Sequence, residues 1–143
     1  MPKIILLSLI FACIDISTEV VFTSLSVVVK SLIEGSAINW ALTGKTYVWM
    51  FFIYAIIPIL FKLFNPYFGQ YSWLVKSLIA VLFIYIIEFV SGFFLELIIG
   101  TCPWKYTEGI HFMGFVRLDY FPFWFAFAIL IVSVYEMLDK SLS

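Results

Sequence analysis

The sequence predicts an all-α integral membrane protein in which residues 1–143 form one domain, a bundle of four transmembrane helices. Of the 143 residues, 64% are hydrophobic and only 12% are charged, whereas a soluble domain carries about 25% charged residues. Four apolar stretches each come close to or exceed the roughly 20 residues that a helix needs to cross the hydrocarbon core. These predicted helices cover residues 4–28, 46–64, 77–99 and 118–137.

The composition and the first helix exclude several other classes of protein. The run Ile79–Ile87 is apolar throughout, whereas the strands of a membrane barrel alternate apolar and polar residues. Eight basic residues against nine acidic ones leave no positive block for nucleic acid. The apolar run after Lys3 lacks a small-x-small cleavage site and continues well beyond the length of a signal peptide, so it is interpreted as a helix.

Four helices place both termini on one side of the membrane and the loops 29–45 and 101–117 on the other. Each side then carries four basic residues, so the positive-inside rule does not orient the chain. Lys62 and Lys76 flank a turn that contains Pro66, and this pair favours cytoplasmic termini.

The two halves of the chain resemble each other at an offset of 69 to 70 residues. Each half reads as a helix with an acid, a loop with a tryptophan and a glycine, and an aromatic helix, which predicts a parallel repeat of two helix hairpins. Chance alignment of apolar helices is the alternative. The aligned pairs are Glu19 with Glu88, Gly44 with Gly114, Phe51 with Phe121 and Tyr54 with Trp124.

Acids lie within the apolar predicted helices at Asp15, Glu19, Glu88 and Glu96. An acid near the centre of a membrane helix costs about 2.5–3.5 kcal/mol on insertion scales, so we expect these side chains to face the protein interior. Asp15 and Glu19 are four residues apart, and Glu88, Gly92 and Glu96 repeat the same spacing, which puts each set on one helix face. Gly92 would also allow another backbone to approach closely.

Three of these acids, Glu19, Glu88 and Glu96, lie in the helix halves that run toward the loops 29–45 and 101–117. The sequence therefore predicts an acidic cavity roofed by these loops, with Arg117 or Lys105 as the available partners of the carboxyls. Hydrogen bonding of protonated acids to Ser17, Thr18, Ser91 or Tyr54 is the structural alternative. The same side of the membrane also carries Trp40, Trp104, Lys105, His111, Arg117 and Asp119.

Motifs for common cofactors are absent from the sequence, which contains no H-E-x-x-H, no paired C-x-x-C, no glycine-rich phosphate loop and no G-x-S-x-G elbow. Carboxylates suit hard cations, but the spacing of Glu88 and Glu96 is not a known ligand signature. We predict neither a metal centre nor a cofactor. We expect His111 to have a structural role or to face solvent rather than to act as a ligand.

The second half carries the clearest motif. The run Ile87–Glu96, followed by Cys102-Pro-Trp-Lys-Tyr106, Phe112-Met-Gly114 and Trp124, resembles the transmembrane protein 229 family and its bacterial relatives labelled ABC-transporter permeases. The first half agrees through Glu19, Asn39-Trp40 before Gly44, and Trp49–Tyr54, so the resemblance covers nearly the whole chain.

This resemblance implies a small polytopic membrane protein whose biochemical role is open. The permease label implies an ATPase partner, for which the short polar segments contain no recognisable docking surface. Asp15 stands where a small or aromatic residue is expected. The matching motif positions are Glu19, Glu88, Gly92, Glu96, Trp104, Tyr106 and Gly114.

The leading functional hypothesis is a permease-like protein that binds a cation, a proton or an amphiphilic substrate in the acidic cavity and forms a homodimer in contact with membrane lipid. The first alternative is an intramembrane lipid-modifying enzyme with Glu88 or Glu19 as base and Glu96 as acid or metal ligand. Basic loop residues and His111 would then hold a phosphate headgroup. The second alternative is an accessory subunit that contacts another membrane protein through the aromatic helices.

Overall fold

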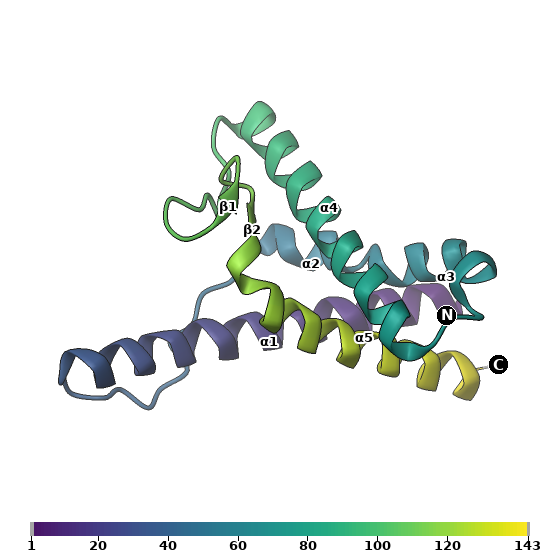
Figure 1. Cartoon of the computed structure of the whole chain (residues 1–143), viewed down its shortest axis with the longest axis horizontal. Helices are drawn as coiled ribbons and strands as arrows, with labels where there is room; N and C mark the ends of the chain where they lie inside the picture. Colours follow the sequence, from purple (N-terminus) through teal and green to yellow (C-terminus); the bar gives the residue numbers. More distant parts are fainter. Residues whose placement is uncertain (1, 143) are drawn as a thin grey trace. The chain divides into compact units, whose positions relative to one another are not determined.

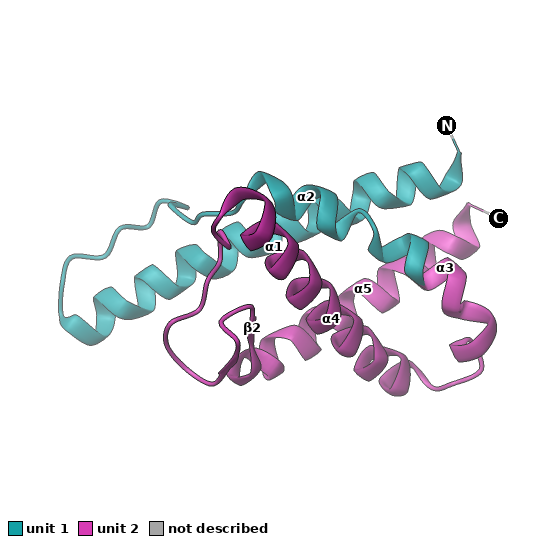
Figure 2. Cartoon of the chain, turned by 90° about the horizontal axis from the view of Figure 1, so that it is seen from above, with its two compact units in different colours: residues 1–60 teal, residues 61–143 magenta. Residues whose placement is uncertain are grey.

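The computed structural model describes residues 2–142. The chain forms two compact units, Met1–Leu60 and Phe61–Ser143 (Figure 2). Four helical segments are long and apolar enough to cross a membrane, as predicted, and the protein therefore has the helices of a multi-pass membrane protein. These segments are Lys3–Glu34, Val48–Phe68, Trp73–Ile99 and Leu118–Ser141.

In the first unit, helix α1 (Lys3–Glu34) packs against the short helix α2 (Val48–Tyr54). The loop between them returns along the second half of α1 before α2 begins (Figure 1). Leu7, Phe11 and Asp15 are buried on α1, at the four-residue spacing of one helix face.

Helix α1 is longer than predicted. Residues 29–34 were expected in a loop, but they continue the helix. Gly35 caps the C-terminus of the helix with a left-handed φ of 66°. No proline or glycine stands between Val27 and Glu34, so nothing in the chain stops the helix earlier. The polar loop is correspondingly shorter than predicted.

The second predicted helix, 46–64, is broken. Helix α2 ends at Tyr54 and α3 (Ile57–Phe68) begins two residues after Ala55. Pro58 explains the interruption, because proline has no N–H to donate to the Tyr54 carbonyl four residues earlier and its ring clashes with that carbonyl. The predicted turn that contains Pro66 is also shorter than expected, since α3 continues through Pro66 to Phe68.

In the second unit, α4 (Trp73–Ile99) packs against α5 (Phe121–Ser141), which follows the 3-10 turn η1 (Leu118–Tyr120) (Figure 1). These helices extend the predicted ranges 77–99 and 118–137 by about one turn each. Small and apolar side chains form a buried stripe along α4, and Glu88 belongs to it. The stripe consists of Ser77, Ala80, Val81, Ile84, Glu88 and Gly92.

The loop between α4 and α5 contains a hairpin that the sequence analysis did not predict. Strands β1 (His111–Phe112) and β2 (Val116–Arg117) pair antiparallel, with His111 opposite Arg117 and Phe112 opposite Val116. Met113 and Gly114 form the turn with positive φ values of 51° and 75°. Two-residue strands with mixed side chains give no alternation for sequence analysis to detect.

Candidate functional site

Glu19 lies where the returning loop of the first unit meets α1. The Thr46 hydroxyl donates a hydrogen bond to the Glu19 carboxylate. Next to this contact, the Gly44 N–H donates to the Ser24 hydroxyl at 2.7 Å and the Lys45 N–H donates to the Thr23 hydroxyl at 2.9 Å. The polar face of α1 therefore satisfies the backbone N–H groups of residues 44 and 45, which would otherwise face an apolar helix.

Gly44 is required by this close approach. A Cβ atom at this position would overlap the Val20 carbonyl and the hydroxyls of Thr23 and Ser24. Asp15, one turn before Glu19, is buried with 3% of its surface exposed. The expected inward orientation thus holds for Asp15, whereas Glu19 is half-buried.

Glu88 is the most deeply buried acid of the second unit, with 1% of its surface exposed. It lies fifteen residues from Trp73 and eleven from Ile99 along α4. At about 1.5 Å of rise per residue, its Cα is at least about 16 Å from either end of the helix. The carboxyl is therefore attached near the middle of a helix that is long and apolar enough to cross a membrane.

Gly92 follows Glu88 on the same face, and side chains of the following loop fill the space beside it. A Cβ at Gly92 would lie 3.0 Å from the Phe115 ring and 3.3 Å from the Cys102 Sγ. We expected another backbone to approach at Gly92. The atoms nearest to this position belong instead to two side chains. Phe115 and Cys102 are both buried.

Glu96 lies at the outer end of the same face and forms an ion pair with a residue of the loop between α4 and α5. The Lys105 Nζ lies 2.5 Å from a Glu96 carboxylate oxygen and 4.0 Å from the centre of the Phe115 ring. This contact confirms Lys105 as the partner of one predicted acid. Glu96 itself is half-buried, with 39% of its side chain exposed.

Two further residues of the resemblance stabilise the same loop. The indole N–H of Trp104, which is buried, donates to the Phe115 carbonyl at 3.2 Å. The Tyr106 N–H donates to the Gly114 carbonyl at 2.8 Å, and a Cβ at Gly114 would lie 2.9 Å from the Lys105 side chain. These contacts assign the motif a structural role in closing the loop over Gly92.

Trp40 and His111, two of the loop residues expected beside the acidic cavity, are both exposed. Trp40 is 80% exposed. His111 is exposed, and its Nδ1 accepts a hydrogen bond from the Gly114 N–H at 3.2 Å, which agrees with the structural role that the sequence favoured.

Arg117 does not pair with a buried helix carboxyl as expected. Its guanidinium donates to Asp119, with the shortest contact at 2.9 Å, and to the Tyr120 hydroxyl at 3.1 Å. The hydrogen bond to Asp119 raises the pKa of Arg117 above its ordinary value. In the lipid-enzyme hypothesis, Arg117 and Lys105 would bind a phosphate headgroup. Both cations are already paired with acids in the structure, Arg117 with Asp119 and Lys105 with Glu96.

The hydroxyl groups expected to bind the acids are used elsewhere. Ser17 donates to the Cys13 carbonyl and Thr18 to the Ile14 carbonyl, both within α1. Ser91 donates to the Ile87 carbonyl at 2.5 Å. A hydroxyl on a helix readily bonds the carbonyl four residues back, so the predicted hydrogen bonding of these three residues to the acids is wrong.

No metal centre is formed by the residues that the structure describes within either unit: no group of three or more histidine, cysteine, aspartate or glutamate side chains is close enough to hold an ion. The carboxylates of α4 are separated by the Gly92 turn, and Glu96 is engaged by Lys105.

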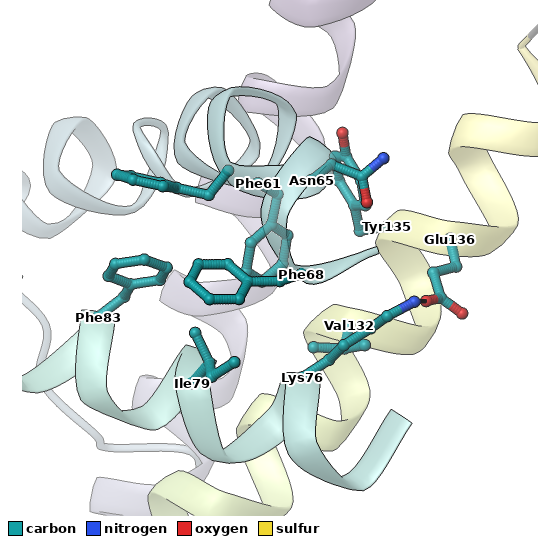
Figure 3. A pocket seen from close by; sticks show the side chains of 10 residues that line it. Phe61, Asn65, Phe68, Lys76, Ile79, Phe83, Val132, Tyr135 and Glu136 are labelled. Carbon is teal, nitrogen blue, oxygen red and sulfur yellow. Dashed lines mark hydrogen bonds and ion pairs between the residues drawn. The ribbon is translucent and has the colours of Figure 1, made fainter. Parts of the chain in front are cut away.

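A pocket that sequence analysis missed lies at the other end of the second unit, among α3, α4 and α5 (Figure 3). We call it the Lys76–Glu136 pocket, because Lys76 Nζ lies 2.5 Å from a Glu136 carboxylate oxygen beside it. The sequence feature that could have indicated this pocket is Glu136, an acid inside the predicted helix 118–137. Phe61, Phe64, Asn65, Phe68, Lys76, Ile79, Phe83, Val132, Tyr135 and Glu136 line the pocket.

Comparison with known proteins adds no identification. No family model matches the sequence, and no solved structure matches the chain. The resemblance to the transmembrane protein 229 family therefore stays a prediction.

Proposed function

We propose that the protein is a small permease-like membrane protein in which the Glu88 carboxyl binds and releases a proton or a small cation. The observation that carries this proposal is the burial of Glu88, 1% exposed, near the middle of α4. An ionisable group at this depth lowers the stability of the helix in a membrane. Ionisable side chains at this depth in membrane proteins commonly belong to ion pathways or proton relays.

The surroundings of Glu88 suggest how access to it is controlled. Glu96 lies two turns further along the same face, and the Phe115 ring covers Gly92 between the two acids. An ion that moves from Glu96 toward Glu88 must displace this ring. Lys105 contacts both Phe115 and Glu96, so neutralisation of Glu96 would release the lysine and the ring together.

Proton flux through proteoliposomes tests this proposal. We expect wild-type protein to acidify vesicles under a potassium gradient with valinomycin, as followed by a pH-sensitive dye. Glu88→Gln should reduce the flux at least about tenfold, because the amide cannot exchange a proton. Glu34→Gln is the matched control, since Glu34 is an exposed acid at the end of α1, and it should keep the wild-type flux.

The amphiphilic cation ethidium provides a second probe of the same site. Uptake of ethidium that is lost in Glu88→Gln would support cation binding at this carboxyl. Proton and ethidium fluxes equal to those of protein-free vesicles, or full flux in a folded Glu88→Gln variant, would overturn the proposal and make Glu88 a structural residue.

A further inference from the structure

We propose that the Lys76–Glu136 pocket binds the headgroup of a phospholipid that carries both a phosphate and a primary ammonium. In this arrangement Glu136 accepts hydrogen bonds from the ammonium and Lys76 donates to the phosphate. The inference is independent of the role proposed for Glu88, because the two sites lie at different depths of α4 and share no residue.

The depth of the charged pair matches the headgroup region. Lys76 is the fourth residue of α4, and Glu136 is five residues before the end of α5. At about 1.5 Å per residue, their Cα atoms lie within about 8 Å of the helix ends, where a membrane-spanning helix meets the phosphate and glycerol groups of lipids.

The charge of the pocket selects a zwitterion. Lys76 and Glu136 are the two ionisable side chains among its lining residues other than Tyr135, and they neutralise each other across 2.5 Å. A purely anionic ligand that engages Lys76 would leave Glu136 without its partner, which is costly for a half-buried acid. A ligand with both charges replaces the ion pair by two charge-assisted contacts.

The chemistry of the acid selects a primary ammonium. The Glu136 carboxylate lines the pocket and accepts hydrogen bonds from N–H groups, which a primary ammonium carries and a trimethylammonium lacks. Asn65 adds an amide that can donate to or accept from the headgroup at the pocket wall.

An aromatic wall completes the site. The rings of Phe64 and Phe83 lie with their centres 5.1 Å apart, as do those of Phe61 and Tyr135. Figure 3 shows Lys76 extending toward Glu136 on one side of the pocket, with the rings of Phe68 and Phe83 on the other. Such a wall packs against the glycerol and upper acyl carbons of a lipid and attracts a cation to the ring faces.

Competition between lipids tests the site. Purified protein is incubated with an equimolar mixture of phosphatidylethanolamine, phosphatidylcholine and phosphatidylglycerol of identical acyl chains, and the retained lipid is measured by native mass spectrometry. We expect the ethanolamine lipid to be retained about tenfold over each of the others, because only its ammonium donates charge-assisted hydrogen bonds to the Glu136 carboxylate. Glu136→Gln should remove this preference, and Lys76→Met should reduce retention of all three lipids.

Two further variants separate binding from stability. Ile79→Phe fills the pocket and leaves both charges in place, so it should reduce retention of the ethanolamine lipid about tenfold without lowering the thermal midpoint. Lys30→Met breaks the exposed Lys30–Glu34 ion pair on α1 and should leave retention unchanged.

Equal retention of the three lipids by wild-type protein, or an unchanged preference in Glu136→Gln, would overturn the inference and make the pair a structural link between α4 and α5. Soluble phosphoethanolamine provides the last arm of the experiment. Displacement of the lipid by equimolar soluble headgroup would show a site for a water-soluble zwitterion and would contradict a lipid site, whereas failure to displace it supports the aromatic wall as part of the site.

Discussion

The Lys105 ammonium lies 2.5 Å from the Glu96 carboxylate at the outer end of α4. The same ammonium lies 4.0 Å from the centre of the Phe115 ring, which covers Gly92 one turn deeper. One lysine thus connects the end of the helix with the loop that folds back along it. The contact gives the loop between α4 and α5 a defined position relative to Glu88.

Lys105→Met is expected to lower the free energy of unfolding by about 1 kcal/mol. Both partners of the ion pair are 39% exposed, so solvent screening limits the ion pair to at most about 1 kcal/mol, and the contact with the ring adds a similar small amount. Denaturation in mixed micelles measures the change. Lys30→Met removes a more exposed pair of 3.8 Å and should change stability by less than about 0.5 kcal/mol. Equal effects of the two substitutions would refute the assigned role of Lys105.

Gly44→Ala is expected to destabilise the first unit by about 1–3 kcal/mol, the range of an overpacked site. The new methyl group would overlap the Val20 carbonyl and the Ser24 hydroxyl, which accepts the Gly44 N–H. Limited proteolysis of the segment 36–46 reports whether it has left α1. Gly35→Asn serves as control, because Gly35 has open space around it and asparagine tolerates its left-handed φ. Proteolysis at the wild-type rate in Gly44→Ala would show that the close approach is not needed.

Trp104→Phe is expected to cost about 1 kcal/mol or slightly more. The substitution removes the buried hydrogen bond that the indole N–H donates to the Phe115 carbonyl, and this carbonyl loses that donor. Unfolding in mixed micelles gives the difference in stability. Trp40→Phe is the matched control, since Trp40 is 80% exposed, and its effect should be near zero. A loss at Trp40 as large as that at Trp104 would contradict the structural role of the buried indole.

Cys102 is expected to react slowly with iodoacetamide at pH 7.5 in a Cys13→Ser background. Burial raises the pKa of the Cys102 thiol above its ordinary value, so less thiolate, the reactive form, is present at any given pH. The rate should therefore keep rising beyond the ordinary thiol pKa of about 8.5. Gly92→Ala should accelerate the reaction. The added Cβ would lie only 3.3 Å from the Cys102 Sγ, so the thiol must move away from its buried position. A rate equal to that of the unfolded protein would contradict burial of this thiol.

The same raised pKa predicts how stability depends on pH. A thiol that is harder to ionise in the folded state contributes its full stability below the ordinary pKa of about 8.5, and this contribution is lost as the pH rises through the raised folded value. We expect unfolding at pH 10 to be easier for wild-type protein than for Cys102→Ser when each is compared with its own stability at pH 7. An identical pH dependence of the two proteins would show that ionisation of Cys102 does not contribute.

Helix content and the local role of several residues could be predicted because they depend on local chemistry. The i,i+4 spacing of Glu88, Gly92 and Glu96 predicted one helix face, and the structure places Glu88 and Gly92 in a buried stripe. The break before Pro58 was missed, although the proline alone predicts it. The hairpin at residues 111–117 could not be predicted, since such short strands have no detectable periodicity.

The sequence by itself determined that four apolar helices form and that acids interrupt them, because length, hydropathy and helical period are properties of consecutive residues. Only the tertiary structure decided which groups meet. Arg117 bonds the nearby Asp119, Lys105 reaches Glu96, and Lys76 pairs with Glu136, sixty residues away in the chain. Partners of this kind depend on how the elements pack, and a helical period identifies a face without specifying what lies opposite to it.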